Sequence, residues 1–113
     1  MNIFYGSCKG KPDVPANSSI EATLDAALEI FRGLDARSGF LGINLGERFA
    51  VQFAPQKQRG VRVELLDTHG PAFDSCVADA QFAESLIRAA AEGQDVFRIA
   101  RASNYEWEHL DMA

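Results

Sequence analysis

Two cysteines and two histidines are the residues of this chain best suited to nucleophilic or metal chemistry. A thiol beside an imidazole forms a nucleophile–base pair, and its partners meet in space rather than in sequence, so Cys8 or Cys76 can be matched with His69 or His109. Cys76, however, stands beside Val77 in an apolar stretch, which is typical of a small core residue. The spacing of these residues fits no metal site. We therefore expect no metal and no cofactor.

Carboxylates offer a second kind of chemistry. Glu64 lies in one strand-like run, and Glu106 and Glu108 lie in the last one. Two acids within hydrogen-bond reach shift each other's pKa and can act as acid and base. The alternative, which we favour, is a set of acids on an exposed sheet face that form cross-strand ion pairs with Arg48 and Arg62. The sequence contains no phosphate-binding glycine loop, no Gly-x-Ser-x-Gly and no His-x-x-x-His.

Two segments have the periodicity of helices. The first carries apolar residues at steps of three and four. A capping box of Ser18 and Glu21 predicts where this helix starts, and we expect it to end near Gly33. The second is capped by Asp79 and stops at residue 93. Residues 94–102 fit either a helical turn or a strand.

Six runs read as strands: residues 2–7, 39–45, 48–53, 61–66, 73–77 and 105–111. The middle runs are joined by short loops, which indicates antiparallel hairpins because a parallel return needs a longer crossover. The order is β-α-β-β-β-β-α-β. We therefore predict an α+β fold with a single antiparallel β-sheet and two helices packed on one face. The 113 residues form one domain, 1–113.

The charge of the chain is negative and unevenly distributed. The formal net charge is −5, of which residues 57–113 contribute −4, since six Lys and Arg stand against ten Asp and Glu. A basic face is needed to bind phosphates, so nucleic acid is a poor candidate ligand. The end of the chain carries Glu106, Glu108 and Asp111. These acids either aid solubility or steer a basic protein partner.

Trp107 has two interpretations, and Tyr105 shares them. It either anchors the last strand in the core or lies partly exposed as an interface anchor, because tryptophan is enriched among residues that dominate binding energy. No apolar run approaches the roughly 20 residues that cross a bilayer, and the first residues do not read as a secretion signal. We expect a cytoplasmic protein with no membrane contact.

The layout resembles that of small α+β immunity proteins encoded beside bacterial polymorphic toxins, including those of contact-dependent and type VI delivery systems. Four features between about residues 18 and 108 carry the resemblance: the capped helix 18–33, the strand triplet 40–45, 49–53 and 61–66, the helix ending at Gly93, and the closing Tyr105-x-Trp107. The resemblance implies a non-catalytic inhibitor that binds a cognate toxin. Many such toxins are nucleases or other enzymes with basic clefts.

We therefore expect an immunity protein that neutralises its toxin by stoichiometric, electrostatically assisted binding and is not an enzyme. The expected partner-binding residues are Glu106, Glu108, Asp111, Trp107, Asp67 and Asp74. One alternative is a small enzyme or ligand-binding domain that uses a cleft between sheet and helices, with Glu64 and His109 converging there. Another is a homo-oligomer whose exposed strand edges pair between chains.

Overall fold

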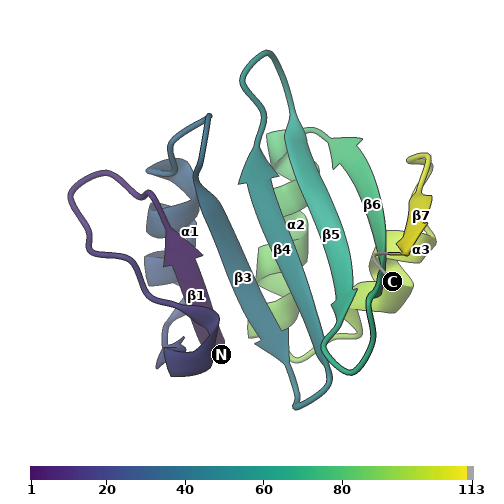
Figure 1. The fold of residues 1–113 in the computed structure, drawn as a ribbon, viewed down its shortest axis with the longest axis horizontal. Helices are drawn as coiled ribbons and strands as arrows, with labels where there is room; N and C mark the ends of the chain where they lie inside the picture. The colour runs from purple at the N-terminus through teal and green to yellow at the C-terminus, as the bar shows by residue number, and fades with distance from the viewer. Residues whose placement is uncertain (112–113) are drawn as a thin grey trace.

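The computed structural model describes residues 1–111, which form a seven-stranded sheet and three α-helices (Figure 1). The strands are β1 (Asn2–Gly6), β2 (Ile20–Glu21), β3 (Phe40–Leu45), β4 (Phe49–Pro55), β5 (Val61–Asp67), β6 (Ala72–Ala78) and β7 (Glu108–Asp111). The helices are α1 (Leu24–Arg32), α2 (Ala80–Ala91) and α3 (Val96–Arg101), with a 3₁₀ turn, η1 (Ala16–Ser18), before β2. Among these residues, no helix combines the length and apolar character needed to cross a membrane.

The sheet is antiparallel throughout, in the order β2-β1-β3-β4-β5-β6-β7. Helices α1 and α2 pack against β3, and α2 also reaches β5, so one face of the sheet is covered. In Figure 1 the three α-helices lie behind the sheet, and the face toward the viewer carries none of them. We call these the helix face and the open face. The predicted α+β class, with one antiparallel sheet and helices on one face, is confirmed.

The core lies between the sheet and the helices. One cross-strand row on the helix face runs Tyr5, Leu41, Phe53, Val63 and Cys76, and every member is buried. Side chains of α1 and α2 fill the other half of the core, because each helix turns one apolar side toward the sheet. The largest of them are Leu28, Ile30, Phe31, Leu86 and Ile87.

The open face is packed near β1 by two aromatic rings that lie over glycines. Phe4 covers Gly42 on the neighbouring strand, and Phe40 covers Gly6 in the same way. The ring centroids of Phe4 and Phe40 are 6.4 Å apart. Since glycine has no side chain, each ring lies directly on the backbone of the adjacent strand.

The predicted start of the first helix is wrong. Ser18 lies in η1, and the residues that follow form β2, which pairs with β1 instead of opening the helix. Helix α1 is capped by Thr23, whose hydroxyl accepts from the Ala26 N–H at 3.2 Å. Glu21 bonds to the amino group of Met1 at 2.9 Å instead of closing a capping box. The predicted end at Gly33 and the Asp79 cap of α2 are confirmed.

The end of the chain also differs from the prediction. Residues 94–102, which fitted either a helical turn or a strand, contain the helix α3. It is capped by Asp95, whose carboxylate accepts from the Arg98 N–H at 3.2 Å. The last strand begins only at residue 108 because the preceding residues pack elsewhere. The Tyr105 ring lies 4.8 Å from that of Phe82, and its hydroxyl donates to Asp79 at 3.0 Å. These contacts hold Tyr105 against α2 rather than beside β6.

Candidate functional site

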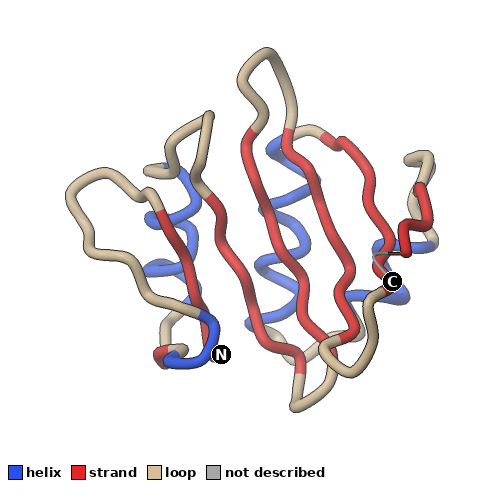
Figure 2. Tube along the Cα trace, viewed as in Figure 1, coloured by secondary structure: helices blue, strands red, loops and turns tan. Residues whose placement is uncertain are grey.

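The acidic edge, which we define as Glu106, Glu108 and Asp111, lies on and just before β7 at the end of the sheet. All three residues are exposed. Within residues 1–111, the side chains of Glu106 and Glu108 make no hydrogen bond or ion pair. Figure 2 shows β7 as a short strand at the margin of the molecule, and no described strand pairs with its outer side. The edge therefore presents negative charge next to open backbone groups.

A hollow separates the acidic edge from the C-terminal half of β6. Strand β7 pairs with β6 only as far as Ser75, although β6 continues to residue 78. The space beyond that pairing is about 470 Å³ and is lined by Arg62, Val77, Glu106 and Glu108 among others. Val77 is 51% exposed there, and Arg62 donates to the Ser75 hydroxyl at 3.1 Å.

Asp74 links β6 to both β7 and α3. Its carboxylate accepts from Arg101 at 3.3 Å and contacts Nδ1 of His109 at 2.7 Å. The two partners come from different elements, so the carboxylate fixes the position of the short last strand. Unlike Glu106 and Glu108, Asp74 is therefore already engaged within the protein.

Asp67 is also engaged. Arg48 donates to both of its oxygens at 2.9–3.2 Å, and the His69 N–H donates at 2.9 Å. Hydrogen bonds from the Arg48 side chain, then from the His69 backbone, lower the pKa of Asp67 to about 2. A hollow of about 380 Å³ is lined by both Asp67 and Asp74. The structure thus brings these two predicted residues together at one hollow, with an arginine on each.

Trp107 is half-buried and packs against the hydrophobic core. Its indole N–H donates to the Ser103 hydroxyl at 3.4 Å. The packing of Trp107 against the core fits the first of its two interpretations, and its partial exposure fits the second. A part of its surface lines the hollow beside β6.

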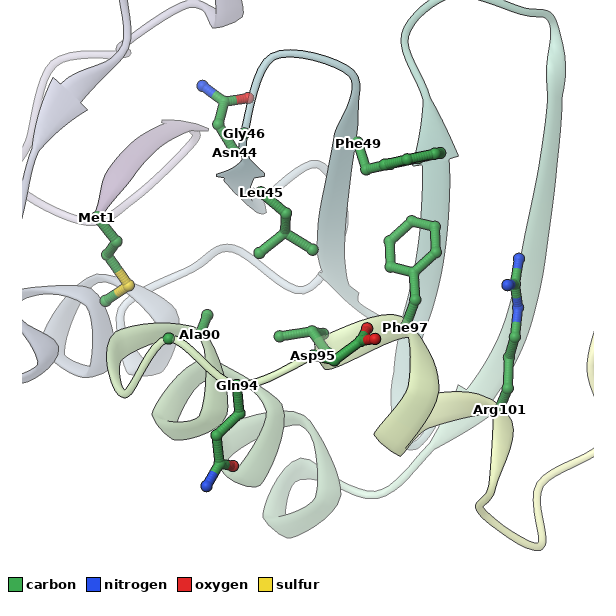
Figure 3. Close-up of a pocket in the computed structure, with 12 residues that line it drawn as sticks. Met1, Asn44, Leu45, Gly46, Phe49, Ala90, Gln94, Asp95, Phe97 and Arg101 are labelled. Atoms are coloured by element: carbon green, nitrogen blue, oxygen red, sulfur yellow. The ribbon is translucent and has the colours of Figure 1, made fainter.

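A second candidate site is a groove at one end of the helix face, which we call the aromatic groove. It has a volume of about 790 Å³ and lies between the β3–β4 turn and the α2–α3 connection. The ring of Phe49, which is 38% exposed, contacts that of Phe97 in a tilted arrangement, with the ring centroids 5.2 Å apart. Figure 3 shows these rings at one side of the groove, with Leu45 and Met1 toward the other. Asp95 is its acidic lining residue.

Two arginines flank the rings of the aromatic groove. The guanidinium of Arg48 lies 5.1 Å from the Phe49 ring, and that of Arg101 lies 5.3 Å from the Phe97 ring. Cation–π contacts of this kind hold the rings in place. The sequence prediction missed this groove because α3 was left undecided. The available signal was an N-capping aspartate followed by Val96 and Ala100 at a spacing of four.

The pair of carboxylates, which was the less favoured of the two interpretations, is not formed between Glu64 and Glu108. Glu64 lies on the open face, in a cross-strand row in which Ser75 separates it from Glu108. Strands are about 4.8 Å apart, so these two acids are about 10 Å apart along the row. Burial raises the pKa of Glu64, against the opposing effects of Arg62 and a hydrogen bond from Gln52 at 3.5 Å. His109 lies on the helix face, so Glu64 and His109 do not converge either.

The cysteines occupy core positions. Both are buried and free, and the Cys8 thiol donates to the Ile30 carbonyl at 3.5 Å. Cys8 is 6% exposed, and its backbone forms an isolated antiparallel bridge with Leu34. Burial raises the pKa of Cys76 to about 11. In the described part of the chain, no three His, Cys, Asp or Glu side chains form a group that could hold a metal ion.

Fold and site together define a small α+β protein. It has an acidic edge at one margin of its sheet and an aromatic groove at one end of the helix face. No protein family, curated protein or solved structure compared with this chain matches it.

Proposed function

We propose that this chain is an immunity protein that neutralises a bacterial toxin domain by stoichiometric binding. The observation that carries the proposal is the acidic edge, where the side chains of Glu106 and Glu108 are exposed and have no hydrogen-bond or ion-pair partner among residues 1–111. Asp67 and Asp74 have their charge offset by arginines, whereas the carboxylates of Glu106 and Glu108 remain available to another protein.

Electrostatics explains what such an edge contributes. Opposite fields on two proteins raise the rate of encounter by about 10–1,000-fold, and this gain falls as salt is added. A toxin domain with a basic substrate cleft has the complementary field. The net charge of −5 on the whole chain acts in the same direction. Binding over the cleft then prevents the substrate from entering it.

The test uses the purified chain and the toxin domain encoded next to it. Association is followed by stopped-flow fluorescence between 20 and 500 mM salt, for the natural chain and for the double variant Glu106→Lys and Glu108→Lys. We expect the double variant to associate about tenfold more slowly at low salt, with a flatter salt dependence. Glu29→Lys, on the exposed side of α1, is the matched control and should change the rate little.

Two results would contradict the proposal. One is the absence of a complex together with no rescue of cells that express the toxin. The other is repeated conversion of a substrate by the isolated chain, because a stoichiometric inhibitor has no turnover.

The aromatic groove favours a second candidate, a ligand-binding domain. Its volume of about 790 Å³ lies within the usual 300–1,000 Å³ of small-molecule sites. Its apolar walls and the nearby Arg101 suit an aromatic anion, so anilinonaphthalene sulfonate is a suitable probe. Fluorescence that rises with the natural chain but not with Ala90→Trp, which fills the groove, would support this candidate. Unchanged fluorescence with both would eliminate it.

A further inference from the structure

The outer side of β7 is an open strand edge. The strand ends the sheet order, and the described chain places no other strand beyond it. Along any strand, alternate residues direct their N–H and C=O to opposite sides, so half of the backbone groups of β7 point away from β6. Such an edge can accept an additional strand from another molecule.

Two cross-strand rows of the open face end at β7. An apolar row runs from Leu66 through Phe73 to Leu110, and all three are half-buried. A polar row runs through Ser75 to Glu108. An added strand would extend both rows, with one residue beside Leu110 and another beside Glu108.

We propose that the partner adds an extended segment to β7 in antiparallel pairing, with the pattern apolar-x-basic. The apolar residue lies beside Leu110 and extends the apolar row. The basic residue, two positions later, lies beside Glu108, and a further basic residue two positions on lies near Glu106. The inference deepens the proposed function and rests on it, because it gives the bound part of the partner a chemistry and a geometry.

The structure favours this occupant over a second copy of the chain. Pairing two β7 strands would bring two acidic edges together, and like charges on neighbouring strands are unfavourable. The edge is also held in place before binding. Asp74 attaches β7 to β6 and α3 through His109 and Arg101, so little order has to be gained when a segment docks.

The experiment titrates the ¹⁵N-labelled full chain with the peptide acetyl-Thr-Val-Thr-Lys-Thr-Lys-Thr-amide. The control peptide has glutamate in place of both lysines. We expect the largest shift changes and slower amide exchange at residues 108–111, with the lysine peptide binding about fivefold or more tightly than its control. Glu108→Lys should weaken the lysine peptide and strengthen the glutamate peptide.

Three outcomes would overturn the inference: equal binding of the two peptides, shift changes centred away from β7, or a dimer in sedimentation that Glu108→Lys abolishes. The toxin measurements separate this inference from the proposed function. A toxin complex that forms although the peptide does not bind β7 leaves the function intact and overturns the inference. A peptide that binds β7 while no toxin complex forms supports the inference and removes the function.

Discussion

Replacing Gly42 with alanine tests how tightly the open face is packed beside β1. A Cβ at Gly42 would lie only 2.5 Å from Cε1 of Phe4, and two further atoms of that ring would be nearer still. The Phe4 side chain is 6% exposed and contacts Phe40, so its ring has little room to move. The backbone of Gly42 is not left-handed, and the cost of the alanine is therefore steric.

The size of the effect follows from this geometry. Forcing an extra carbon into a packed site costs about 1–3 kcal/mol, so we expect Gly42→Ala to lower the free energy of unfolding by that amount. In a Phe4→Ala background the clash is gone. There the same substitution should be neutral or stabilise by about 0.4–1 kcal/mol, because alanine restricts the unfolded chain. The coupling energy between the two positions is then about 1–4 kcal/mol.

Urea unfolding followed by circular dichroism measures all four chains of this double-mutant cycle. Gly70→Ala is the matched control, since nothing lies within 4 Å of a Cβ there and no left-handed backbone is involved. It should stay within about 0.5 kcal/mol of the natural chain. An equal loss from Gly42→Ala with and without Phe4 would refute the reasoning, because the cost would then not come from the ring.

Two further predictions concern titratable groups. Hydrogen bonds from Arg48 lower the pKa of Asp67 from 3.8 to about 2, so the pair stabilises the folded state above about pH 4 and loses this contribution as the pH falls toward 2. Asp67→Asn should flatten that part of the pH profile of the urea midpoint, and superimposable profiles would contradict this. Burial raises the pKa of Cys76 to about 11, so a chromogenic disulfide reagent at pH 8 should label it much more slowly in the folded chain than in urea. Equal labelling rates would show that the thiol is not protected.

The strands of the central hairpins were predictable from sequence because local patterns determine them. Val51 and Phe53 alternate with polar or small residues, and Gly46 supplies the left-handed turn that closes the β3–β4 hairpin. Phe49 belongs to the same alternation and points to the helix face. It is nevertheless 38% exposed, because it lies at the first position of β4, where the tilted ring of Phe97 from α3 covers it only in part.

The elements that build the candidate site depend on distant contacts. Ile20 fits the apolar period of the first helix, yet it pairs with Ile3 as part of β2, since the backbone bonds of the sheet prevail over local helix preference. Tyr105 alternates with Trp107 as in a strand, but its bond to Asp79 draws it to α2. Neither Ile3 nor Asp79 lies close in sequence to the residue that it contacts, so patterns among neighbouring residues do not predict these contacts.

The carboxylates on and just before β7 influence which strands can pair with its exposed edge. An exposed strand edge invites pairing with any other strand, and carboxylates such as Glu106 and Glu108 oppose pairing with a second acidic copy. The same charges attract a basic segment. Added salt screens both effects, so self-association of the chain should rise with salt while binding of the lysine peptide should fall. If self-association rises with salt while peptide binding falls, the edge selects its partner by charge. If both change in the same direction, the apolar row of the edge determines binding.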